Sequence, residues 1–343
     1  MAGALGSVGA VLPRCSFLLN PSRTLMRPTK PSLAAAIRAS PSPTTATATI
    51  GANAELALEA KVESRRNKLA CPICYYPLIT KNDQNSASTY GYTLECNSCK
   101  KAYLNNETYI DLTVAGGSED YSETMPAATE LFRTPLVSYL YERGWRQNFV
   151  WGGFPGPEKE FEMAKDYLKP TIGGTIVDAS CGSGLFSRLF AKSGMYSLVI
   201  ALDFSENMLR QCNEFIKQEN ISKENLILVR ADISRLPFSS SSIDAVHAGA
   251  AIHCWPSPST AVAEISRVLR PGGVFVATTF ILDILPSTIP VLKTVRQYFA
   301  QATSNTIYLS EGELGDLCRA CGLVNFTCVR SGPFVMLSAS KPR

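Results

Sequence analysis

The fold is decided by residues 175–184, which read TIVDASCGSG. The apolar start predicts a buried strand, and the pattern after Gly184 predicts a helix. Glycines at a strand-to-helix turn permit positive φ angles and let the backbone approach a ligand closely. The first turn of the following helix offers unpaired N–H groups to the same ligand. This segment therefore predicts a ligand-binding loop in an α/β fold.

From residue 158 onward, strands and helices alternate. Strands are predicted at 175–178, 196–202, 226–230, 245–251, 274–280, 326–330 and 334–338, and helices at 158–168, 185–192, 206–220, 260–269 and 311–320. Strict alternation indicates a parallel sheet that is covered on both faces. The last two strands are expected to form an antiparallel hairpin around Ser331-Gly332. We therefore expect a doubly wound, mostly parallel, seven-stranded Rossmann-like sheet with a C-terminal antiparallel hairpin.

Acidic residues follow three successive strands of this sheet, at Asp178, Asp203 and Asp232. Sheets of this type bind ligands beyond the carboxyl ends of their strands. An acid at the end of the second strand accepts hydrogen bonds from both hydroxyls of a ribose. Asp232 and Ile233, at the end of the third strand, are placed to contact an adenine ring by its edge and its face. The pattern therefore predicts a site for an adenosine-containing cofactor.

These residues, with DFSENML at 203–209, DISRLPF at 232–238, IDAV at 243–246 and LRPGG at 269–273, resemble the class I S-adenosylmethionine-dependent methyltransferases. Among these, the chain looks most like the branch that contains the ubiquinone/menaquinone C-methyltransferases. The resemblance extends from about Glu158 to the end of the chain. It implies an enzyme, a methyltransferase, with S-adenosyl-L-methionine as its cofactor.

The resemblance also implies a set of cofactor-binding residues: Asp178, Ser180, Gly182, Gly184, Asp203, Phe204, Asp232 and Ile233. Asp178 and the two glycines would hold the methionine portion, Asp203 the ribose, and Asp232 with Ile233 the adenine. The chain departs from the family at Ser180, where a glycine is usual. A Cβ at this position would crowd the cofactor if φ is positive, which leaves a non-catalytic cofactor-binding scaffold as one alternative.

The two histidines are candidates for proton transfer, which is needed only if the nucleophile must first lose a proton. His247 lies inside a predicted strand, and we expect it to be a packed, hydrogen-bonded core residue. His253 lies just beyond that strand and matches a histidine common in this methyltransferase branch, where ordering a loop and transferring a proton are both open roles. The sequence assigns no general base.

Two C-x-x-C pairs precede the main domain, Cys71/Cys74 and Cys96/Cys99. Each pair aims two sulfurs at one centre, and four thiolates form a closed tetrahedral site, so we expect a structural zinc ion. Short strands are predicted at 75–78 and 90–94. A redox dithiol and unligated thiols are the alternatives. The spacing resembles a zinc ribbon, which is also found ahead of the methyltransferase domain in bacterial large-subunit ribosomal RNA guanine methyltransferases.

Residues 1–54 contain five basic residues and no acidic residue, and they are rich in serine and threonine. This composition is typical of an organellar transit peptide. We expect the chloroplast, in the stroma or at a plastoglobule surface, with the mitochondrion as the alternative. The whole chain carries a net charge of +4, so the remainder carries −1. Residues 55–125 contain seven basic and ten acidic residues, which argues against nucleic acid as a partner but does not settle the question.

The expected organisation is a disordered transit peptide at 1–54, a zinc-ribbon-like module at 65–115, a linker and cofactor/substrate lid at 116–157, and the methyltransferase domain at 158–343. Within that domain, 281–309 is a substrate-side insertion whose apolar stripe suits a core, a lipophilic acceptor or a peripheral lipid surface. No run of apolar residues is long enough for a transmembrane helix. We expect a small, lipophilic or aromatic methyl acceptor, with a ribosomal RNA base as the alternative.

Overall fold

The computed structural model describes residues 68–81, 93–116, 127–145, 149–150, 153–281 and 307–343. The expected transit peptide at 1–54 and nearly all of the insertion at 281–309 lie outside these residues. Two sheets are formed within the described part of the chain, one of three strands and one of eight. In that part, no helix combines the length and the apolar character needed to cross a membrane.

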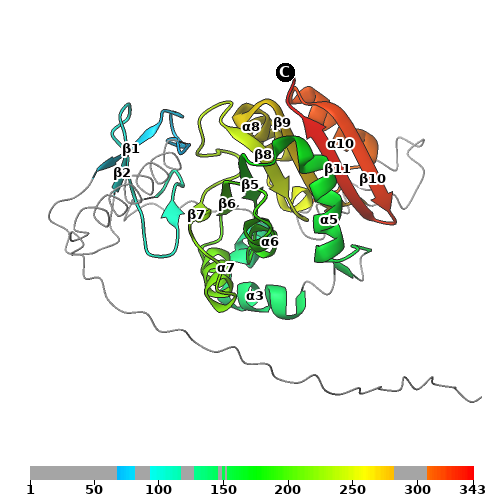
Figure 1. The fold of residues 1–343 in the computed structure, drawn as a ribbon, viewed down its shortest axis with the longest axis horizontal. Helices are drawn as coiled ribbons and strands as arrows, with labels where there is room; N and C mark the ends of the chain where they lie inside the picture. The colour runs from blue at the N-terminus through cyan, green and yellow to red at the C-terminus, as the bar shows by residue number, and fades with distance from the viewer. Residues whose placement is uncertain (1–67, 82–92, 117–126, 146–148, 151–152, 282–306) are drawn as a thin grey trace, which may run out of the picture. The chain divides into compact units, whose positions relative to one another are not determined.

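The larger sheet has the strand order β10-β11-β9-β8-β5-β6-β7-β4. Its strands are β4 (Ile110–Asp111), β5 (Thr175–Ala179), β6 (Leu198–Asp203), β7 (Leu226–Arg230), β8 (Ile243–Ala248), β9 (Leu269–Phe280), β10 (Val324–Ser331) and β11 (Phe334–Ser340). Strands β4 to β9 pair in parallel, whereas β10 and β11 form the antiparallel hairpin and β11 pairs antiparallel with β9. The doubly wound sheet with a terminal hairpin is thus confirmed (Figure 1).

The sheet differs from the sequence expectation in one added strand and in several strand bounds; β8, for example, was expected at 245–251 and spans Ile243–Ala248. The sheet has an eighth strand, β4, which has only two residues and pairs with β7 at its edge. Strand β9 begins at Leu269, where a helix was expected to continue, because Leu269 already pairs with Ile243 in β8. The register between these two strands then shifts between Ile243 and Ala245.

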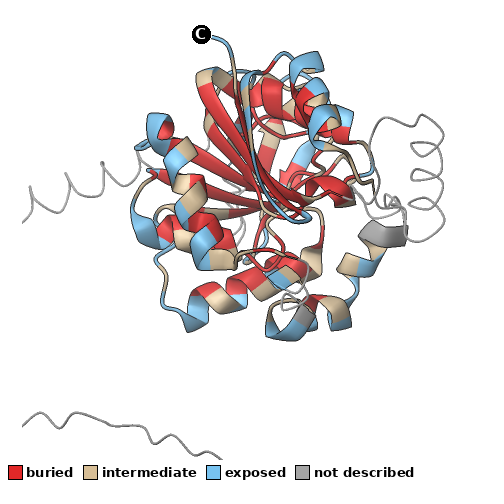
Figure 2. Ribbon diagram, turned by 90° about the vertical axis from the view of Figure 1, so that its right-hand side faces the viewer, coloured by how far each residue is buried: buried red, intermediate tan, exposed pale blue. Residues whose placement is uncertain are grey.

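Helices cover both faces of the sheet. Successive residues of the central strand β5 point to opposite faces, and both sets are buried. Ile176 of β5 packs in one core cluster with α5 (Pro157–Leu168), α6 (Leu185–Ser193) and α7 (Glu206–Gln218). Val177 packs in the other with α8 (Pro258–Val268) and α10 (Glu311–Ala320). All five residues of β5 are buried, and the exposed faces of the helices point outward in Figure 2. Each large apolar side chain buried in this way contributes about 1.5–3 kcal/mol.

The smaller sheet is antiparallel and consists of β1 (Leu78–Lys81), β2 (Thr93–Cys96) and β3 (Ala102–Leu104). Strand β1 begins later than the strand predicted at 75–78, and β2 overlaps the end of the strand predicted at 90–94. The first begins late because Tyr75 has a φ of +60° and belongs to a tight turn around the cysteines. Residues 90–92 lie outside the described part of the chain. Side chains of this module, including Leu94 and Tyr103, belong to the same core cluster as Phe238 of the main domain.

Along the chain between β4 and α5, the structure forms α2 (Ala127–Arg133), α3 (Pro135–Leu140) and the short helix η1 (Tyr141–Trp145). The sequence predicted a linker and lid here but not these helices. The turn between α2 and α3 is closed by Thr134, whose hydroxyl donates to the carbonyl of Leu131 at 2.7 Å. The peptide N–H of Ser138 then donates to the carbonyl of Thr134. Pro135 suits the first position of α3 because that position needs no N–H donor.

Candidate functional site

The loop after β5 has a left-handed backbone at three of its five residues: Ser180 (φ +57°), Gly182 (φ +56°) and Gly184 (φ +79°). Gly184 has no room for a side chain, because a Cβ there would lie 2.1 Å from Sγ of Cys212 in α7. Burial raises the pKa of the neighbouring Cys181 thiol well above its usual value, so this thiol stays protonated. The backbone of the loop is therefore shaped by its glycines.

Ser180 adopts the positive φ that makes the family's glycine useful, although it carries a Cβ. A left-handed conformation costs a residue other than glycine roughly 1–2 kcal/mol. The hydroxyl of Ser180 accepts a hydrogen bond of 2.9 Å from Nε1 of Trp255, which is itself 3% exposed. This bond holds the serine side chain against the indole and offsets part of the strain.

Asp178 points into the protein interior rather than toward the strand ends. The hydroxyl of Ser187 donates to Oδ2 of Asp178 at 2.5 Å, and Nδ1 of His247 lies 2.8 Å from Oδ1. All three side chains are buried, and the His247 ring packs on Phe186. His247 is therefore the packed, hydrogen-bonded residue that its place in a strand predicts. Each oxygen of Asp178 thus has one protein partner, and its contact with the methionine portion, which the resemblance implies, stays a prediction.

Asp203, the last residue of β6, is joined directly to the glycine loop. The peptide N–H of Gly182 donates to Oδ2 of Asp203 at 2.8 Å, and that of Ser205 donates to Oδ1 at 2.8 Å. Burial raises the pKa of Asp203 to about 6, although these two N–H groups favour its charged form. A carboxylate has about four acceptor positions, so each oxygen retains capacity for one further donor.

The third strand end lies beside the second. The peptide N–H of Ala231 donates to the carbonyl of Asp203 at 3.1 Å, which places the Asp232 turn next to the end of β6. Oδ1 of Asp232 accepts from the N–H of Ser234 at 2.8 Å, and Ile233 is buried. The structure therefore brings Asp203, Asp232 and the glycine loop to one edge of the sheet, as the sequence predicts.

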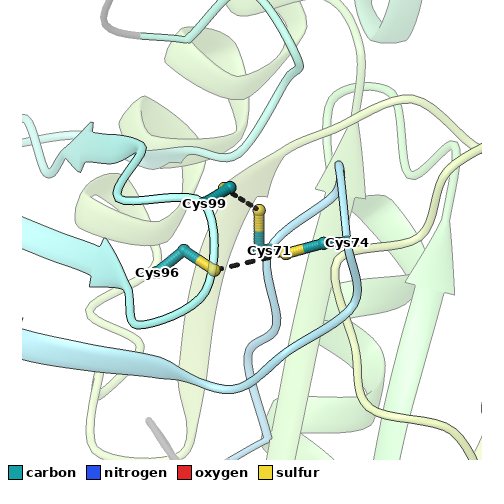
Figure 3. A group of neighbouring side chains, drawn as sticks. All are labelled: Cys71, Cys74, Cys96 and Cys99. Carbon is teal, nitrogen blue, oxygen red and sulfur yellow. Dashed lines mark hydrogen bonds between the residues drawn. The ribbon is translucent and has the colours of Figure 1, made fainter.

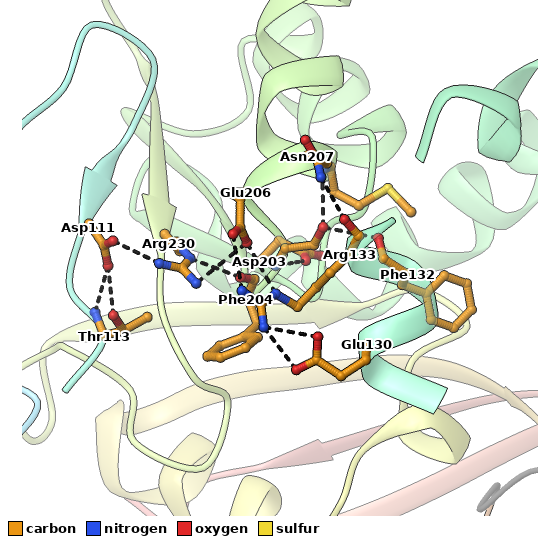
Figure 4. Close-up of polar contacts among 12 residues, drawn as sticks. Asp111, Thr113, Glu130, Phe132, Arg133, Asp203, Phe204, Glu206, Asn207 and Arg230 are labelled. Carbon is orange, nitrogen blue, oxygen red and sulfur yellow. Dashed lines mark hydrogen bonds and ion pairs between the residues drawn. The ribbon is translucent and has the colours of Figure 1, made fainter. Parts of the chain in front are cut away.

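Phe204 follows Asp203 and lies between two arginines. The guanidinium carbons of Arg133 and Arg230 are each 5.3 Å from the centre of its ring. Both arginines also pair with Glu206 at the start of α7, at 3.1 and 3.4 Å. Figure 4 shows this network, in which Arg230 continues to Asp111 of β4 and Arg133 continues to Glu130 of α2.

Helices α2, α3 and η1 contribute residues that the sequence did not predict for the site. The hydroxyl of Ser183 in the glycine loop donates to Oε2 of Glu142 at 2.5 Å, and Arg188 of α6 donates to the other oxygen. A Cβ on Gly182 would lie 3.2 Å from the ring of Tyr141. Tyr141 and Glu142 of η1 therefore pack directly against the glycine loop. The only sequence signal was the glycine- and aromatic-rich composition of 141–157, which suggested a lid without naming its contacts.

Aromatic rings contact one another in a row beside the glycine loop, at the carboxyl ends of β8 and β9. Phe149 lies 5.4 Å from Phe154 and 5.8 Å from Phe280, between ring centres. Phe280, the last residue of β9, lies 5.3 Å from the ring of His253, and His253 stacks parallel to Tyr308 at 6.1 Å. The aromatic segment before α5 thus meets the end of the sheet.

His253 belongs to the short helix η3 (Ile252–Cys254) and is buried. Its Nδ1 is hydrogen-bonded to Oγ1 of Thr279 at 3.1 Å, and its carbonyl accepts from the N–H of Ile307 at 3.0 Å. Burial lowers the pKa of His253 to about 4, so its ring is neutral near neutral pH. This histidine both orders the chain at residue 307 and places a neutral imidazole among the aromatic rings.

The four cysteines of the small module converge on one point (Figure 3). Their sulfurs all lie within 4.8 Å of one another, and the contacts cross between the pairs: Cys71 to Cys99 at 3.6 Å and Cys74 to Cys96 at 3.3 Å. Four convergent sulfurs are a donor set that suits zinc. The structure brings together all four residues that the sequence proposed as ligands.

The two cysteine turns have the same backbone geometry, which spacing alone does not reveal. In each, the residue after the second cysteine is left-handed, Tyr75 at φ +60° and Lys100 at φ +61°. Its N–H donates to the carbonyl of the first cysteine, at 2.8 Å in one turn and 2.9 Å in the other. Two independent turns of identical form, facing each other, fit a single ion between them.

Comparison with known proteins indicates the methyltransferase family that the sequence motifs resemble. The sequence profile described as "Methyltransferase domain" matches residues 177–277. The chain is 65% identical, over 295 residues, to an Arabidopsis thaliana protein named as an uncharacterized chloroplastic methyltransferase; the match covers 84% of this chain and 83% of that protein. A second Arabidopsis thaliana protein named in the same way is 53% identical, with 82% and 80% covered.

More distant relatives match a smaller share of the chain. The chain is 35% identical to a demethylmenaquinone methyltransferase of Staphylococcus haemolyticus over 165 residues, which is 48% of this chain and 59% of that enzyme, less than two thirds of its length. A solved structure, Haemonchus contortus phosphoethanolamine N-methyltransferase 2 in complex with S-adenosyl-L-methionine, is similar with a TM-score of 0.51 and 15% identity. That match covers 65% of this chain and 62% of the other, and it shows a common fold.

Proposed function

This chain belongs to the class I S-adenosylmethionine-dependent methyltransferases, and we propose that it methylates a small lipophilic or aromatic acceptor in the chloroplast. S-adenosylmethionine supplies a methyl group on a positively charged sulfur. Transfer is an in-line displacement, so the main task of the protein is to hold acceptor and methyl group close and aligned.

The strand ends around the glycine loop fit the proposed cofactor. Gly182 and Gly184 give the loop its left-handed backbone. Each oxygen of Asp203 has one protein donor and retains one acceptor position, which matches the two hydroxyls of a ribose. Asp232 and Ile233 offer an acceptor and an apolar face for adenine. Ser180, Phe204 and Asp178 complete the set, with Asp178 supporting the loop from within through Ser187 and His247.

The observation that carries the acceptor proposal is the chain of aromatic rings that ends at His253. Phe149 and Phe280, which are only partly buried, offer apolar, flat surfaces beside the glycine loop, and the buried Phe154 packs against both. His253 adds one neutral polar group to them. Sites for small ligands combine a mostly apolar lining with a few placed polar atoms, and this combination suits an aromatic or prenylated molecule better than a charged one.

A ribosomal RNA base is the second candidate, and the cysteine module is the observation that favours it. The net charge of residues 55–125 opposes this candidate, since ten acidic residues outnumber seven basic ones and phosphate binding requires a basic surface. A scaffold that binds the cofactor without turnover is the third candidate. The strained but hydrogen-bonded Ser180 argues against it, because the loop keeps the backbone form that a glycine would give.

We also propose that Cys71, Cys74, Cys96 and Cys99 hold a structural zinc ion. With four thiolates the ion would have no open position, so it would stabilise the fold and take no part in methyl transfer. For location within the chloroplast, the proposal is the stroma or a plastoglobule surface. Exposed apolar side chains on α3, with Leu136 68% and Tyr139 51% exposed, are compatible with contact to a lipid surface.

The acceptor class is tested by incubating the protein with S-adenosylmethionine labelled in its methyl group and a chloroplast extract, followed by separation into RNA and organic-solvent fractions. We expect label in the organic fraction. The D203A variant should transfer none, and D316A, which changes an exposed residue of α10, should match the unmodified protein. Label found only in RNA would replace the small-molecule acceptor by RNA, and cofactor binding without any transfer would favour the scaffold.

A further inference from the structure

The cysteine module is attached to the segment 232–238, which begins with the two residues proposed to contact adenine. The peptide N–H of Ala70, next to Cys71, donates to the carbonyl of Pro237 at 2.8 Å. Leu69 forms a β-bridge with Phe238. Both side chains are almost fully buried, Leu69 at 1% and Phe238 at 0% exposure. The first cysteine turn is thus fixed to the far end of the adenine segment.

A second attachment passes through Tyr75, the left-handed residue that follows Cys74. The guanidinium of Arg267 in α8 lies 4.1 Å from the centre of the Tyr75 ring. The same guanidinium donates to the carbonyls of Leu236 and Phe238, both at 2.8 Å. Arg267 therefore binds the backbone of the adenine segment while its planar group rests on a residue of the cysteine turn.

A third attachment enters from the other side of the module. Strand β4, which follows β3 within the cysteine module (65–115), pairs in parallel with the end of β7, and Asp111 forms an ion pair with Arg230 at 2.9 Å. The N–H of Leu112 also donates to the carbonyl of Arg230 at 2.8 Å. Arg230 stands two residues before Asp232 and reaches Glu206 as well (Figure 4). The adenine segment is thus held by the module at both of its ends.

We propose that the metal centre positions the adenine segment 232–238, so that metal occupancy and cofactor affinity are coupled. This inference rests on the zinc and cofactor sites proposed above. Without the ion, the four sulfurs lose their common centre, and the two cysteine turns remain joined by the pairing of Leu78 with Cys96 and by the contact of Cys71 with Tyr103. The turn that carries Ala70 and Tyr75 is then held less firmly. By thermodynamic reciprocity, a ligand held by the adenine segment must then also strengthen retention of the metal. We expect an effect of about tenfold, within the usual range of such couplings.

The test measures zinc release from the full-length protein into a coloured chelator, with and without S-adenosylhomocysteine. Elemental analysis first gives the zinc content, and calorimetry gives the affinity for S-adenosylhomocysteine. We expect bound S-adenosylhomocysteine to slow zinc release about tenfold. Global unfolding, followed by near-ultraviolet circular dichroism under the same conditions, should be slowed by a clearly smaller factor. Equal slowing of the two processes, or no slowing of zinc release, would overturn the inference.

Two matched variants separate this coupling from a general effect on the module. Y75N and K100N change the equivalent left-handed residues of the two cysteine turns, and asparagine tolerates this conformation. Only Tyr75 contacts Arg267, whereas Lys100 is exposed. Y75N should retain zinc but lose most of the effect of S-adenosylhomocysteine on its release, and K100N should keep the whole effect. Equal behaviour of the two variants would contradict the proposed route.

The same measurements show whether the coupling fails alone or whether the proposed zinc site or cofactor site fails with it. Protein that lacks zinc would remove both the metal assignment and the inference, but would leave the methyltransferase assignment intact. Protein that holds zinc but gives no binding heat with S-adenosylhomocysteine would contradict the proposed cofactor site. Protein that binds both without mutual effect would contradict the inference alone.

Discussion

The amide of Gly182 donates a hydrogen bond of 2.8 Å to Oδ2 of Asp203. This bond joins the loop after β5 to the end of β6, two segments that are neighbours only because their strands pair in parallel. It uses one acceptor position of Asp203 and leaves others for a ligand. The carboxylate therefore fixes the glycine loop and keeps acceptor capacity for the ribose contact that we propose.

Cofactor affinity should depend on pH through Asp203. Burial raises its pKa to about 6, and a ribose donates its hydrogen bonds to the charged carboxylate. Affinity is therefore fully present above this pKa and declines as the pH falls through about 6. Calorimetry with S-adenosylhomocysteine between pH 5 and pH 8 checks this. On the acid side of the pKa, we expect the affinity to fall about tenfold for each pH unit. In D203N the dependence should disappear; a dependence that persists there would assign it to another group.

Glu142 should hold η1 against the glycine loop. E142A removes its bonds to Ser183 and Arg188, and we expect a loss of about 1–2 kcal/mol in stability because these bonds are charge-assisted. Release of S-adenosylhomocysteine should become several-fold faster, as measured by stopped-flow fluorescence. E162A, which breaks an exposed pair with Lys165, is the control and should change stability by less than about 0.5 kcal/mol. Unchanged release in E142A would separate η1 from the cofactor site.

Ser180 and Trp255 should be energetically coupled. S180G relieves the positive φ but leaves the buried indole N–H of Trp255 without its acceptor, so the two effects should nearly cancel, each being about 1 kcal/mol. In a W255F background the donor is absent, and S180G should then stabilise the protein by about 1 kcal/mol. Urea denaturation of the four proteins of this cycle measures the coupling. Equal effects of S180G in both backgrounds would show that the hydrogen bond contributes nothing.

The four cysteines should bind one zinc ion per chain. C99S removes one sulfur from the group and should abolish stoichiometric zinc binding and lower the free energy of unfolding by at least about 2 kcal/mol. C254S is the control, because burial raises the pKa of Cys254 to about 12 and this thiol lies outside the cysteine group. Elemental analysis and thermal denaturation make the comparison. Full zinc content in C99S would exclude the four-thiolate site.

Local sequence patterns were sufficient to predict most of the fold. Runs such as 198–202 and 226–229 are continuously apolar because parallel strands are buried on both faces. Strand β4 escaped prediction since two residues, Ile110 and Asp111, have no detectable periodicity. The late start of β1 follows from the left-handed Tyr75, which is imposed by the cysteine turn rather than by strand propensity.

The candidate site was predictable in its positions but not in its side-chain directions. The places of Asp203 and Asp232 follow from the strand ends. The orientation of Asp178 depends on His247, sixty-nine residues away and on the adjacent strand, and no local pattern reveals such a partner. The contact between Glu142 and Ser183 also depends on tertiary packing, so the lid residues could be suspected only from composition.

The most direct test of the central claim is calorimetric binding of S-adenosylhomocysteine to D203A, with D316A as the matched control. The account predicts that D316A binds like the unmodified protein and that D203A, folded by circular dichroism, loses about 100-fold in affinity, corresponding to about 2.7 kcal/mol of charge-assisted hydrogen bonding. Unchanged affinity in a folded D203A protein would contradict the assignment of this strand end as the cofactor site.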